Sequence, residues 1–308
     1  MSKILVTGGA GFIGSTLVDK LIDQGHAVTV LDNLVTGRRD YLNQAADFWE
    51  RDILDPELIT LMQTAKFDLV YHLAAQIDVR ISVSDPVFDN QINVLGGLNL
   101  LTAARQSGVK KVVMASTGGA IYGETEELPT SESAPTYPLS PYGIHKLTLE
   151  KYLNYYYQVY GLNYTVLRFA NVYGPRQYKG GEAGVIAVFT EAMAKGKTCV
   201  LYGDGQQTRD FVYVDDVVAA LVSAAEIDCR GEINISTGVE IDMWQMVAAI
   251  EAAASDKLKL DRAPARLGEQ RRSVLLNRRA LETLNWRPQI EFAEGVRRTY
   301  DWVKNNAS

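Results

Sequence analysis

Residues 3–14, with the sequence KILVTGGAGFIG, decide the fold that this chain is expected to adopt. A short apolar run leads into glycines at positions 8, 11 and 14, and apolar residues at helical spacing then continue as far as Gly25. Residues 27–31 form a second apolar run, which ends at Asp32. This order predicts a buried strand, a glycine-rich loop, a helix and a second buried strand.

The alternation of strands and helices continues beyond this unit. Further strands are predicted at residues 67–73, 111–115 and 164–169, with helices at about residues 86–106 and 141–160 between them. Such alternation is typical of a mostly parallel sheet that is covered by helices on both faces. The sequence therefore predicts an α/β fold with a Rossmann-type, doubly wound parallel sheet.

The glycine spacing in residues 8–14 is typical of a loop that binds a dinucleotide. Glycines let the backbone turn tightly and approach a pyrophosphate, whose charge is stabilised at the helix N-terminus. Asp32, at the end of the next strand, would bind the ribose hydroxyls of NAD and repel the extra phosphate of NADP. Arg38 and Arg39 follow closely, so NADP stays an alternative, although NAD is favoured.

The pattern after about residue 171 is less regular, with loops that contain glycine and proline. Elements are still predicted there, as helices at residues 185–195, 215–226 and 244–254 and a strand at 198–202. We expect residues 1–170 to form the NAD-binding Rossmann domain and residues 171–308 to form mainly a smaller α/β substrate-binding lobe. Some of the later segments are expected to return to the first domain.

Composition excludes several classes of function. The net charge of −6 and the pI of about 5.3 argue against a nucleic-acid-binding protein. Cys199 and Cys229 lack the spacing of a zinc site or a disulfide framework, and the three histidines do not cluster as metal ligands, so no metal is expected. Without an apolar run of about 18 residues or a signal-peptide pattern, we expect no contact with a membrane and a cytoplasmic location.

Residues 140–146, with the sequence SPYGIHK, open the helix predicted at 141–160. Ser140 suits the N-cap, and Pro141 suits the first helical position. Tyr142 and Lys146 are four residues apart, so their side chains lie on one face of the helix. Because an ammonium group favours the phenolate, the pair is a candidate acid/base, although the spacing alone also fits a surface pair.

These motifs and several others resemble one family over nearly the full length of the chain. They are TGGAGFIGS at 7–15, LDNL at 31–34, HLAAQ at 72–76, STGGAIYG at 116–123, SPYG at 140–143, LRFANVYGPR at 167–176 and GDGQQTRDFVYVDDV at 203–217. In this set the chain resembles the UDP-glucose (UDP-galactose) 4-epimerase family of the extended short-chain dehydrogenase/reductase superfamily.

The resemblance implies a reaction and its catalytic residues. Such an enzyme interconverts UDP-glucose and UDP-galactose by transient, NAD-dependent oxidation at C4 to a 4-keto intermediate. Tyr142 would be the base, Lys146 would hold the nicotinamide ribose and help to lower the pKa of Tyr142, and Thr117 would hydrogen-bond the reacting oxygen. Ser116 competes with Thr117 for the last role, although the offset of 25 residues to Tyr142 favours Thr117.

The same resemblance implies two sets of binding residues. The expected cofactor contacts are Gly8, Gly11, Phe12, Ile13, Gly14, Asp32, Asn33, Asp52, Ile53, Leu73, Ala74, Ala75, Asn93, Ser116, Tyr142 and Lys146. The expected substrate contacts are Thr117, Asn171, Val185, Tyr202, Arg209, Arg266, Glu269 and Ser273. Arg209 and Arg266 would bind the diphosphate, because arginine suits bidentate recognition of phosphate. The alternative for each is a solvated or ion-paired surface charge.

Two local features bear on the substrate. Gly118, Gly119 and Ala120 cannot transfer protons, whereas dehydratases and decarboxylases of this superfamily usually carry acidic residues there, so epimerisation fits better. By the same resemblance, Ser273 would correspond to the position beside the sugar C2 group, and its small side chain would then let UDP-GlcNAc and UDP-GalNAc be accepted as well. The alternatives are a UDP-glucuronate 4-epimerase or decarboxylase, or a non-catalytic NAD-sensing regulator.

A homodimer is expected from the resemblance, through two helices of each subunit. The apolar residues that could form this contact are Ile92, Leu95 and Leu98 on one helix and Tyr152, Tyr155 and Tyr156 on the other. The alternative is that both stripes pack on the sheet.

Overall fold

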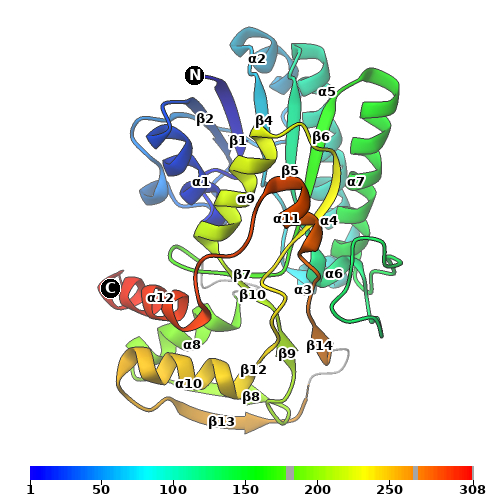
Figure 1. The fold of residues 1–308 in the computed structure, drawn as a ribbon. Coiled ribbons are helices and arrows are strands. Elements are labelled where there is room, and N and C mark those ends of the chain that lie inside the picture. The colour runs from blue at the N-terminus through cyan, green and yellow to red at the C-terminus, as the bar shows by residue number, and fades with distance from the viewer. Residues whose placement is uncertain (178–183, 266–269, 307–308) are drawn as a thin grey trace.

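The computed structural model describes residues 1–177, 184–265 and 270–306. Its centre is a seven-stranded sheet with the strand order β11-β6-β5-β4-β1-β2-β3 (Figure 1). Every neighbouring pair in this sheet is parallel. The strands are β1 (Lys3–Thr7), β2 (Ala27–Asp32), β3 (Asp47–Glu50), β4 (Leu69–His72), β5 (Lys111–Thr117), β6 (Asn163–Phe169) and β11 (Gly231–Ile235). This is the doubly wound Rossmann order, so the predicted fold class is confirmed.

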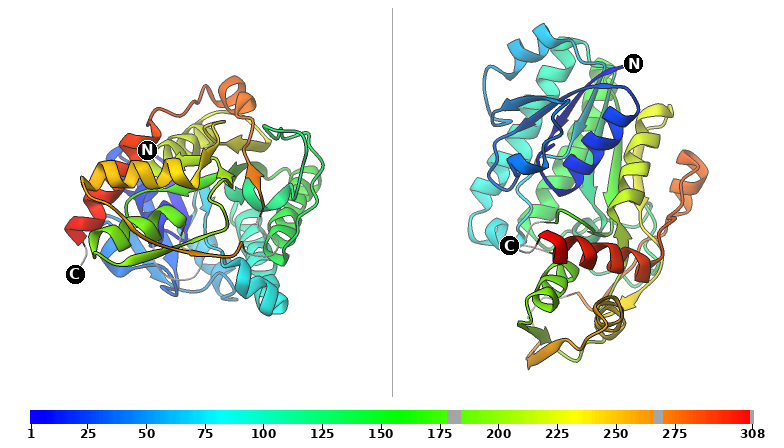
Figure 2. Two further views of the ribbon diagram at one scale, coloured as in Figure 1. Left: turned by 90° about the horizontal axis from the view of Figure 1, so that it is seen from below. Right: turned by 90° about the vertical axis from the view of Figure 1, so that its left-hand side faces the viewer.

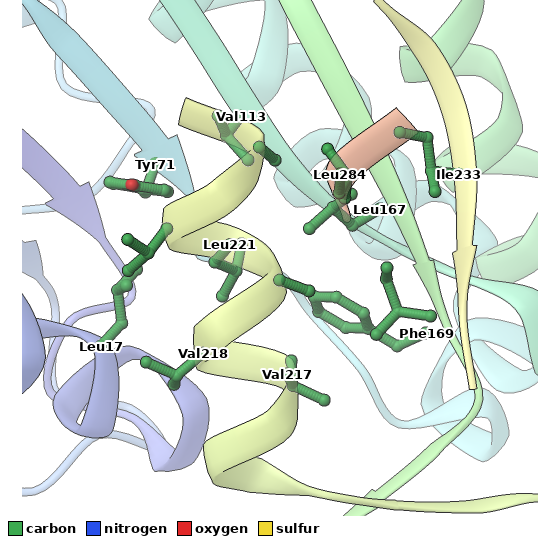
Figure 3. Packing of buried hydrophobic residues seen from close by; sticks show 14 of the residues in the cluster. Leu17, Tyr71, Val113, Leu167, Phe169, Val217, Val218, Leu221, Ile233 and Leu284 are labelled. Carbon is green, nitrogen blue, oxygen red and sulfur yellow. The ribbon is translucent and has the colours of Figure 1, made fainter. Parts of the chain in front are cut away.

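Helices cover both faces of the sheet. One face is covered by α1 (Phe12–Asp23), α9 (Val214–Glu226) and α11 (Arg278–Leu284), and the other by α2 (Leu58–Ala65), α5 (Gly97–Ser107) and α7 (Pro141–Tyr160). Figure 3 shows Val218 and Leu221 of α9 packed among Leu17 of α1 and side chains of the strands. The strands read as continuous apolar runs because both of their faces are buried.

Most of the remaining elements form a smaller group at the carboxyl ends of the sheet strands, which lies below the sheet in Figure 1 and in the right view of Figure 2. The helices are α8 (Val185–Ala194), α10 (Met243–Ala254) and α12 (Phe292–Asn306). The strands are β7 (Asn171–Tyr173), β8 (Thr198–Tyr202), β9 (Thr208–Arg209), β10 (Phe211–Tyr213), β12 (Ile241–Asp242), β13 (Lys259–Ala263) and β14 (Arg272–Ser273). A separate apolar cluster holds this group together. The division into residues 1–170 and 171–308 stays a prediction, in which β11, α9 and α11 are the segments that return to the sheet.

Helix α7 has the bounds that the sequence predicts. The Ser140 hydroxyl accepts a hydrogen bond of 3.2 Å from the Gly143 amide, and Pro141 occupies the first turn. The helix ends at Gly161, whose φ of 73° suits glycine. The start of the helix therefore fixes where Tyr142 and Lys146 lie.

The prediction of a single helix at residues 86–106 is wrong in one respect. The segment consists of α4 (Pro86–Asn90), a π-helical turn η2 (Gln91–Gly96) and α5. Within the turn, the Asn93 side chain accepts from the Gln76 amide at 3.0 Å and donates to the Gln76 carbonyl at 2.8 Å. A side chain that makes tertiary hydrogen bonds at a π turn is typical of a functional site.

The other elements are short. They are α3 (Val79–Ser84), α6 (Gly118–Ile121) and the 3₁₀ turn η1 (Arg39–Tyr41). Among the described residues, no helix is both long and apolar enough to cross a membrane. In the same residues, no group of three or more histidine, cysteine or acidic side chains could hold a metal ion.

Candidate active site

The glycine loop between β1 and α1 is shaped by contacts that exclude any side chain. Gly8 has a φ of +71°, and a Cβ there would lie 2.6 Å from the amide nitrogen of Ala74. A Cβ on Gly14 would lie 2.1 Å from the Gly8 carbonyl oxygen. Gly11 is the N-cap of α1 without a side-chain cap, so the first amides of the helix, at Phe12 and Ile13, can bind an anion.

The loop after β4 faces the glycine loop across the point where the strand order reverses. Leu73 donates its amide to the Thr7 carbonyl at 3.1 Å, and Ala74 donates to the Thr7 hydroxyl at 3.3 Å. Ala75 continues this loop toward Gln76. The crevice at such a reversal is where doubly wound sheets bind their ligands.

Asp32 lies at the carboxyl end of β2, beside the glycine loop. Its carboxylate accepts from the amides of Ala10 at 3.0 Å and Leu34 at 2.8 Å. Burial nevertheless raises the pKa of Asp32. Arg38 forms an ion pair with Asp40, and Arg39 forms one with Glu50. Both arginines thus already have acidic partners, which favours NAD over NADP.

Three of the predicted cofactor contacts, Asn33, Asp52 and Ile53, form a connected group at the edge of the sheet. The Asn33 amide donates to the Asp52 carboxylate at 2.7 Å. Ile53 is buried against Gly96, and its carbonyl accepts from the Asn99 side chain at 2.7 Å. The structure therefore brings Asn33, Asp52 and Ile53 together, and their contact with a cofactor stays a prediction.

Lys146 is buried on the inner face of α7. Its side chain is 4% exposed, and burial lowers its pKa to about 8, although Glu150 and Asp89 favour the charged form. His72, at the end of β4, is also buried, and its pKa is lowered to about 3 by burial and by the Lys146 charge. Lys146 is thus a cation inside the protein, at the end of the sheet that carries the glycine loop.

Tyr142 lies one turn before Lys146. Burial, with a contribution from the negative charge of Asp89, raises the pKa of its phenol above the ordinary value. The polypeptide alone therefore holds Tyr142 as the neutral phenol. The lowering of the pKa of Tyr142 that is expected from Lys146 and the nicotinamide cation together is not seen in the polypeptide alone, and it stays a prediction.

Ser116 and Thr117 differ sharply in their surroundings. The Ser116 hydroxyl donates to the Glu150 carboxylate at 2.6 Å, in a buried position. Thr117 is half-buried at the end of β5, and its hydroxyl does not cap α6. Within the part of the chain that the structure describes, no hydrogen bond occupies the Thr117 hydroxyl. The difference favours Thr117 for contact with a substrate and leaves Ser116 as a support for Glu150.

The residues after Thr117 carry no acid or base. A Cβ on Gly118 would lie 2.2 Å from Cδ1 of the buried Leu275, so this position has no room for a carboxyl group. A Cβ on Gly119 would have no neighbour closer than the Thr117 hydroxyl, at 3.9 Å. With Ala120 next, nothing on this segment can transfer a second proton.

Sequence reasoning missed one group at the site. Asp89 of α4 is fully buried and contacts His145 of α7 at 2.5 Å, between its Oδ2 and the histidine Nδ1. The only signal in the sequence was the position of His145 between Tyr142 and Lys146. Asn93, predicted to contact the cofactor, uses both polar atoms of its side chain to hold Gln76. Its direct contact with the cofactor stays a prediction.

Apart from Thr117 on β5, the described residues that are predicted to contact the substrate lie on the smaller group of elements. Arg209 and Ser273 are opposite each other in the parallel pair β9–β14, and Ser273 is buried. The Asn171 side chain donates to the Asp210 carbonyl at 3.2 Å. Val185 begins α8, and Tyr202 ends β8. Arg266 and Glu269 lie outside the described residues.

Comparison with known proteins agrees with this geometry. A family model described as the NAD dependent epimerase/dehydratase family matches residues 4–236. The chain belongs to this family. The matched residues include the glycine loop, the β4 loop, Thr117 and the Tyr142–Lys146 pair, so the family is identified by the part of the chain that builds the site.

Within the family, the chain is similar to proteins named UDP-glucose 4-epimerase. One from Mycolicibacterium smegmatis is 46% identical, over 99% of each chain. The crystal structure of one from Thermotoga maritima with UDP-glucose has a TM-score of 0.97 at 44% identity, and covers 99% of this chain and 100% of that one. The crystal structure of one from Thermus thermophilus, in complex with NAD, has a TM-score of 0.93 at 44% identity, and covers 98% and 99%.

Proposed function

We propose that this member of the epimerase/dehydratase family is an NAD-dependent UDP-sugar 4-epimerase, which interconverts UDP-glucose and UDP-galactose. The observation that carries the proposal is the combination of Tyr142, Lys146 and Thr117 with the tightly packed Gly118. One base with one hydroxyl partner is enough for reversible oxidation at C4. Elimination of water or loss of carbon dioxide needs further chemistry, and residues 118–120 offer none.

The residues present fit the cofactor. Gly8 and Gly14 allow the tight turn that ends at the N-terminus of α1, where the first amides carry no side-chain cap and suit a pyrophosphate, and Asp32 suits the ribose hydroxyls of NAD. When bound, NAD supplies a hydride acceptor that later returns the hydride to the same carbon. The reaction is therefore an isomerisation with no net oxidation.

The protein groups move the proton and hold the charge. Tyr142 accepts the proton of the C4 hydroxyl and returns it after the sugar has presented its other face. The Thr117 hydroxyl hydrogen-bonds the C4 oxygen. A neighbouring unit charge at about 4 Å contributes about 4 kcal/mol at an effective dielectric near 20, as an upper bound. Since about 1.4 kcal/mol is one pKa unit, Lys146 and the nicotinamide cation together can offset the burial of Tyr142.

The substrate range follows from the β9–β14 pair. Arg209 is the described cation on this pair that suits a diphosphate, and Ser273 lies opposite it. Because Ser273 has a small side chain, an N-acetyl group at C2 of the sugar has room. We include UDP-GlcNAc and UDP-GalNAc among the substrates on this ground.

The decisive experiment uses purified protein without added NAD. UDP-galactose and UDP-glucose are incubated separately, and the products are identified by NMR spectroscopy. We expect both reactions to reach the same mixture, because bound NAD is regenerated in each cycle. A Tyr142→Phe variant should retain NAD and lose the activity.

Other outcomes identify the alternatives. A pentose product from UDP-glucuronate indicates a decarboxylase, and UDP-galacturonate indicates a glucuronate 4-epimerase. NAD binding without turnover of any UDP-sugar indicates a regulator. Full activity in Tyr142→Phe contradicts the assignment of the base.

A homodimer is the assembly that the exposed apolar surface supports. Helices α3, α4 and α7 and the turn η2 expose Val83, Val87, Phe88, Leu95, Ile144, Tyr152 and Tyr155. Large exposed apolar patches of this kind mark interfaces. Of the two stripes expected from the sequence, Tyr156 instead faces the core and hydrogen-bonds Thr102 at 2.8 Å, while Ile92 and Leu98 are partly buried. Light scattering should give twice the chain mass, and a monomer mass contradicts the proposal.

A further inference from the structure

Asp89 is a fully buried carboxylate that no step of the proposed reaction uses. Its Oδ1 accepts from the side-chain amide of Gln76 at 2.6 Å, and its Oδ2 lies 2.5 Å from Nδ1 of His145. Gln76 follows the loop at Leu73–Ala75, and His145 lies between Tyr142 and Lys146. Asp89 thus links the cofactor loop to the catalytic helix.

In the part of the chain that the structure describes, the ion-pair partner of this carboxylate is His145, which is charged only when it is protonated. Among the described residues, no lysine or arginine forms a salt bridge with Asp89. Burying a charge without such a partner is costly, so the position calls for a compensating role. Its charge favours the protonated form of Lys146, one residue after His145.

The other charges around Lys146 are already engaged. Glu150, on the same helix, is paired with Arg168 at 2.6 Å and also accepts from Ser116. From β4, the buried His72 faces Lys146, and its lowered pKa keeps it neutral. Beside Asp89, the phenol of Tyr142 is neutral in the polypeptide. Asp89 is therefore the carboxylate near Lys146 whose charge no arginine balances.

Two other carboxylates close to Asp89 in the chain have partners outside α7. Asp78, on the adjoining α3, is paired with Arg80 at 3.0 Å, and Asp85 caps α4 through the Phe88 amide. Neither is hydrogen-bonded to a residue of α7. Of these three carboxylates, Asp89 is therefore the one that contacts a residue of α7.

We infer that Asp89 is a positioning residue of the active site. Its buried carboxylate ties the cofactor loop to helix α7 through Gln76 and His145, and its charge adds to that of Glu150 in favouring the protonated form of Lys146. The inference rests on the proposed function for its kinetic readout. In support of it, burial brings the pKa of Lys146 down to about 8, while Glu150 and Asp89 oppose that shift. Loss of the Asp89 charge would lower the pKa of Lys146 further.

The Asp89→Asn variant removes the negative charge at position 89 but can keep the hydrogen bonds to Gln76 and His145. An amide can accept from Gln76 and donate to a neutral His145, so both contacts can persist. Removal of a negative charge lowers the pKa of Lys146 and of Tyr142 alike. We expect the pH profile of kcat/KM to move about one unit toward lower pH, as expected for one unit charge within about 10 Å at an effective dielectric near 20. A profile that superposes on that of the wild type overturns the charge role, and so does uniform loss of activity without a shift.

The His145→Ala variant makes the opposite change. It keeps the charge of Asp89 and its hydrogen bond to Gln76 but removes the partner of Asp89 on α7. We expect weaker retention of NAD by about tenfold, the usual size of one lost hydrogen bond to a charged group. His145→Gln restores a donor and should recover most of that retention. If His145→Ala retains NAD as well as the wild type does, the Asp89–His145 contact does not position the cofactor site.

NAD retention also provides a test that needs no turnover. Purified holoenzyme is desalted at pH values from about 6 to 10, and the NAD that stays bound is measured. Retention should fall as Lys146 loses its proton, and in Asp89→Asn this fall should occur about one pH unit lower. If the wild type has no epimerase activity but the retention curves differ in this way, the proposed function fails and the role of Asp89 stands. Coincident retention curves for the wild type and Asp89→Asn overturn the charge role of Asp89.

Discussion

Ser116 donates a hydrogen bond of 2.6 Å to the buried carboxylate of Glu150, whereas the next hydroxyl along β5 points away from this pair. Neighbouring residues of a strand face opposite sides, which separates Ser116 from Thr117. Glu150 also binds Arg168, whose guanidinium contacts the Tyr122 hydroxyl at 3.0 Å. Ser116 is thus part of a buried hydrogen-bonded group with Glu150, and the contact of Thr117 with the substrate stays a prediction.

The two hydroxyls can be distinguished by substitution. Thr117→Val should lower kcat by about 10² to 10³, the usual effect of removing one donor to a reacting oxygen, with little change in unfolding. Ser116→Ala should instead cost about 1–3 kcal/mol of stability, because Glu150 loses a buried partner. Steady-state kinetics and denaturant unfolding of both variants check this. A larger loss of kcat in Ser116→Ala than in Thr117→Val assigns the roles the other way.

Gly118 and Gly119 offer a matched pair in one short helix. Gly118→Ala places a methyl group 2.2 Å from Cδ1 of Leu275, which is buried and held by a hydrogen bond from its amide to Asp210. We expect it to lose about 1–3 kcal/mol of stability, as overpacking does. Gly119→Ala makes only an ordinary contact, at 3.9 Å from the Thr117 hydroxyl, and should be neutral or up to about 1 kcal/mol more stable. Equal unfolding midpoints for the two variants contradict the packing at Gly118.

His72 predicts how stability responds to acid. Burial lowers its pKa to about 3, from an ordinary value of 6.5. Between these values the unfolded chain binds a proton that the folded chain does not, so stability falls as the pH falls from 6.5 toward 3. From pH 7 to pH 5 this contributes a loss of about 2 kcal/mol. His72→Gln removes the group, and urea unfolding at the two pH values should show a smaller loss by that amount. An equal loss in both proteins rules out this origin.

The parts of the molecule that sequence could predict are those with local causes. Ser140 and Pro141 define the start of α7 within a few residues, and the glycine loop identifies the crevice. The π turn in η2 depends on Asn93 reaching Gln76, and the Asp89–His145 contact joins residues far apart in the chain. Neither contact leaves a periodic signal. The two-residue strands β9 and β14 are likewise too short for any alternation to reveal them.

Ser273 predicts the range of sugars. It is buried on β14 opposite Arg209, and a large side chain there would occupy the space assigned to a C2 N-acetyl group. Ser273→Tyr should abolish turnover of UDP-GlcNAc and leave turnover of UDP-glucose within a few-fold. Ser273→Ala is the matched control, because it keeps the space and should retain both activities. Product analysis by NMR spectroscopy decides the matter, with melting temperatures to verify folding. If the wild type does not turn over UDP-GlcNAc, or Ser273→Tyr still does, then Ser273 does not control the sugar.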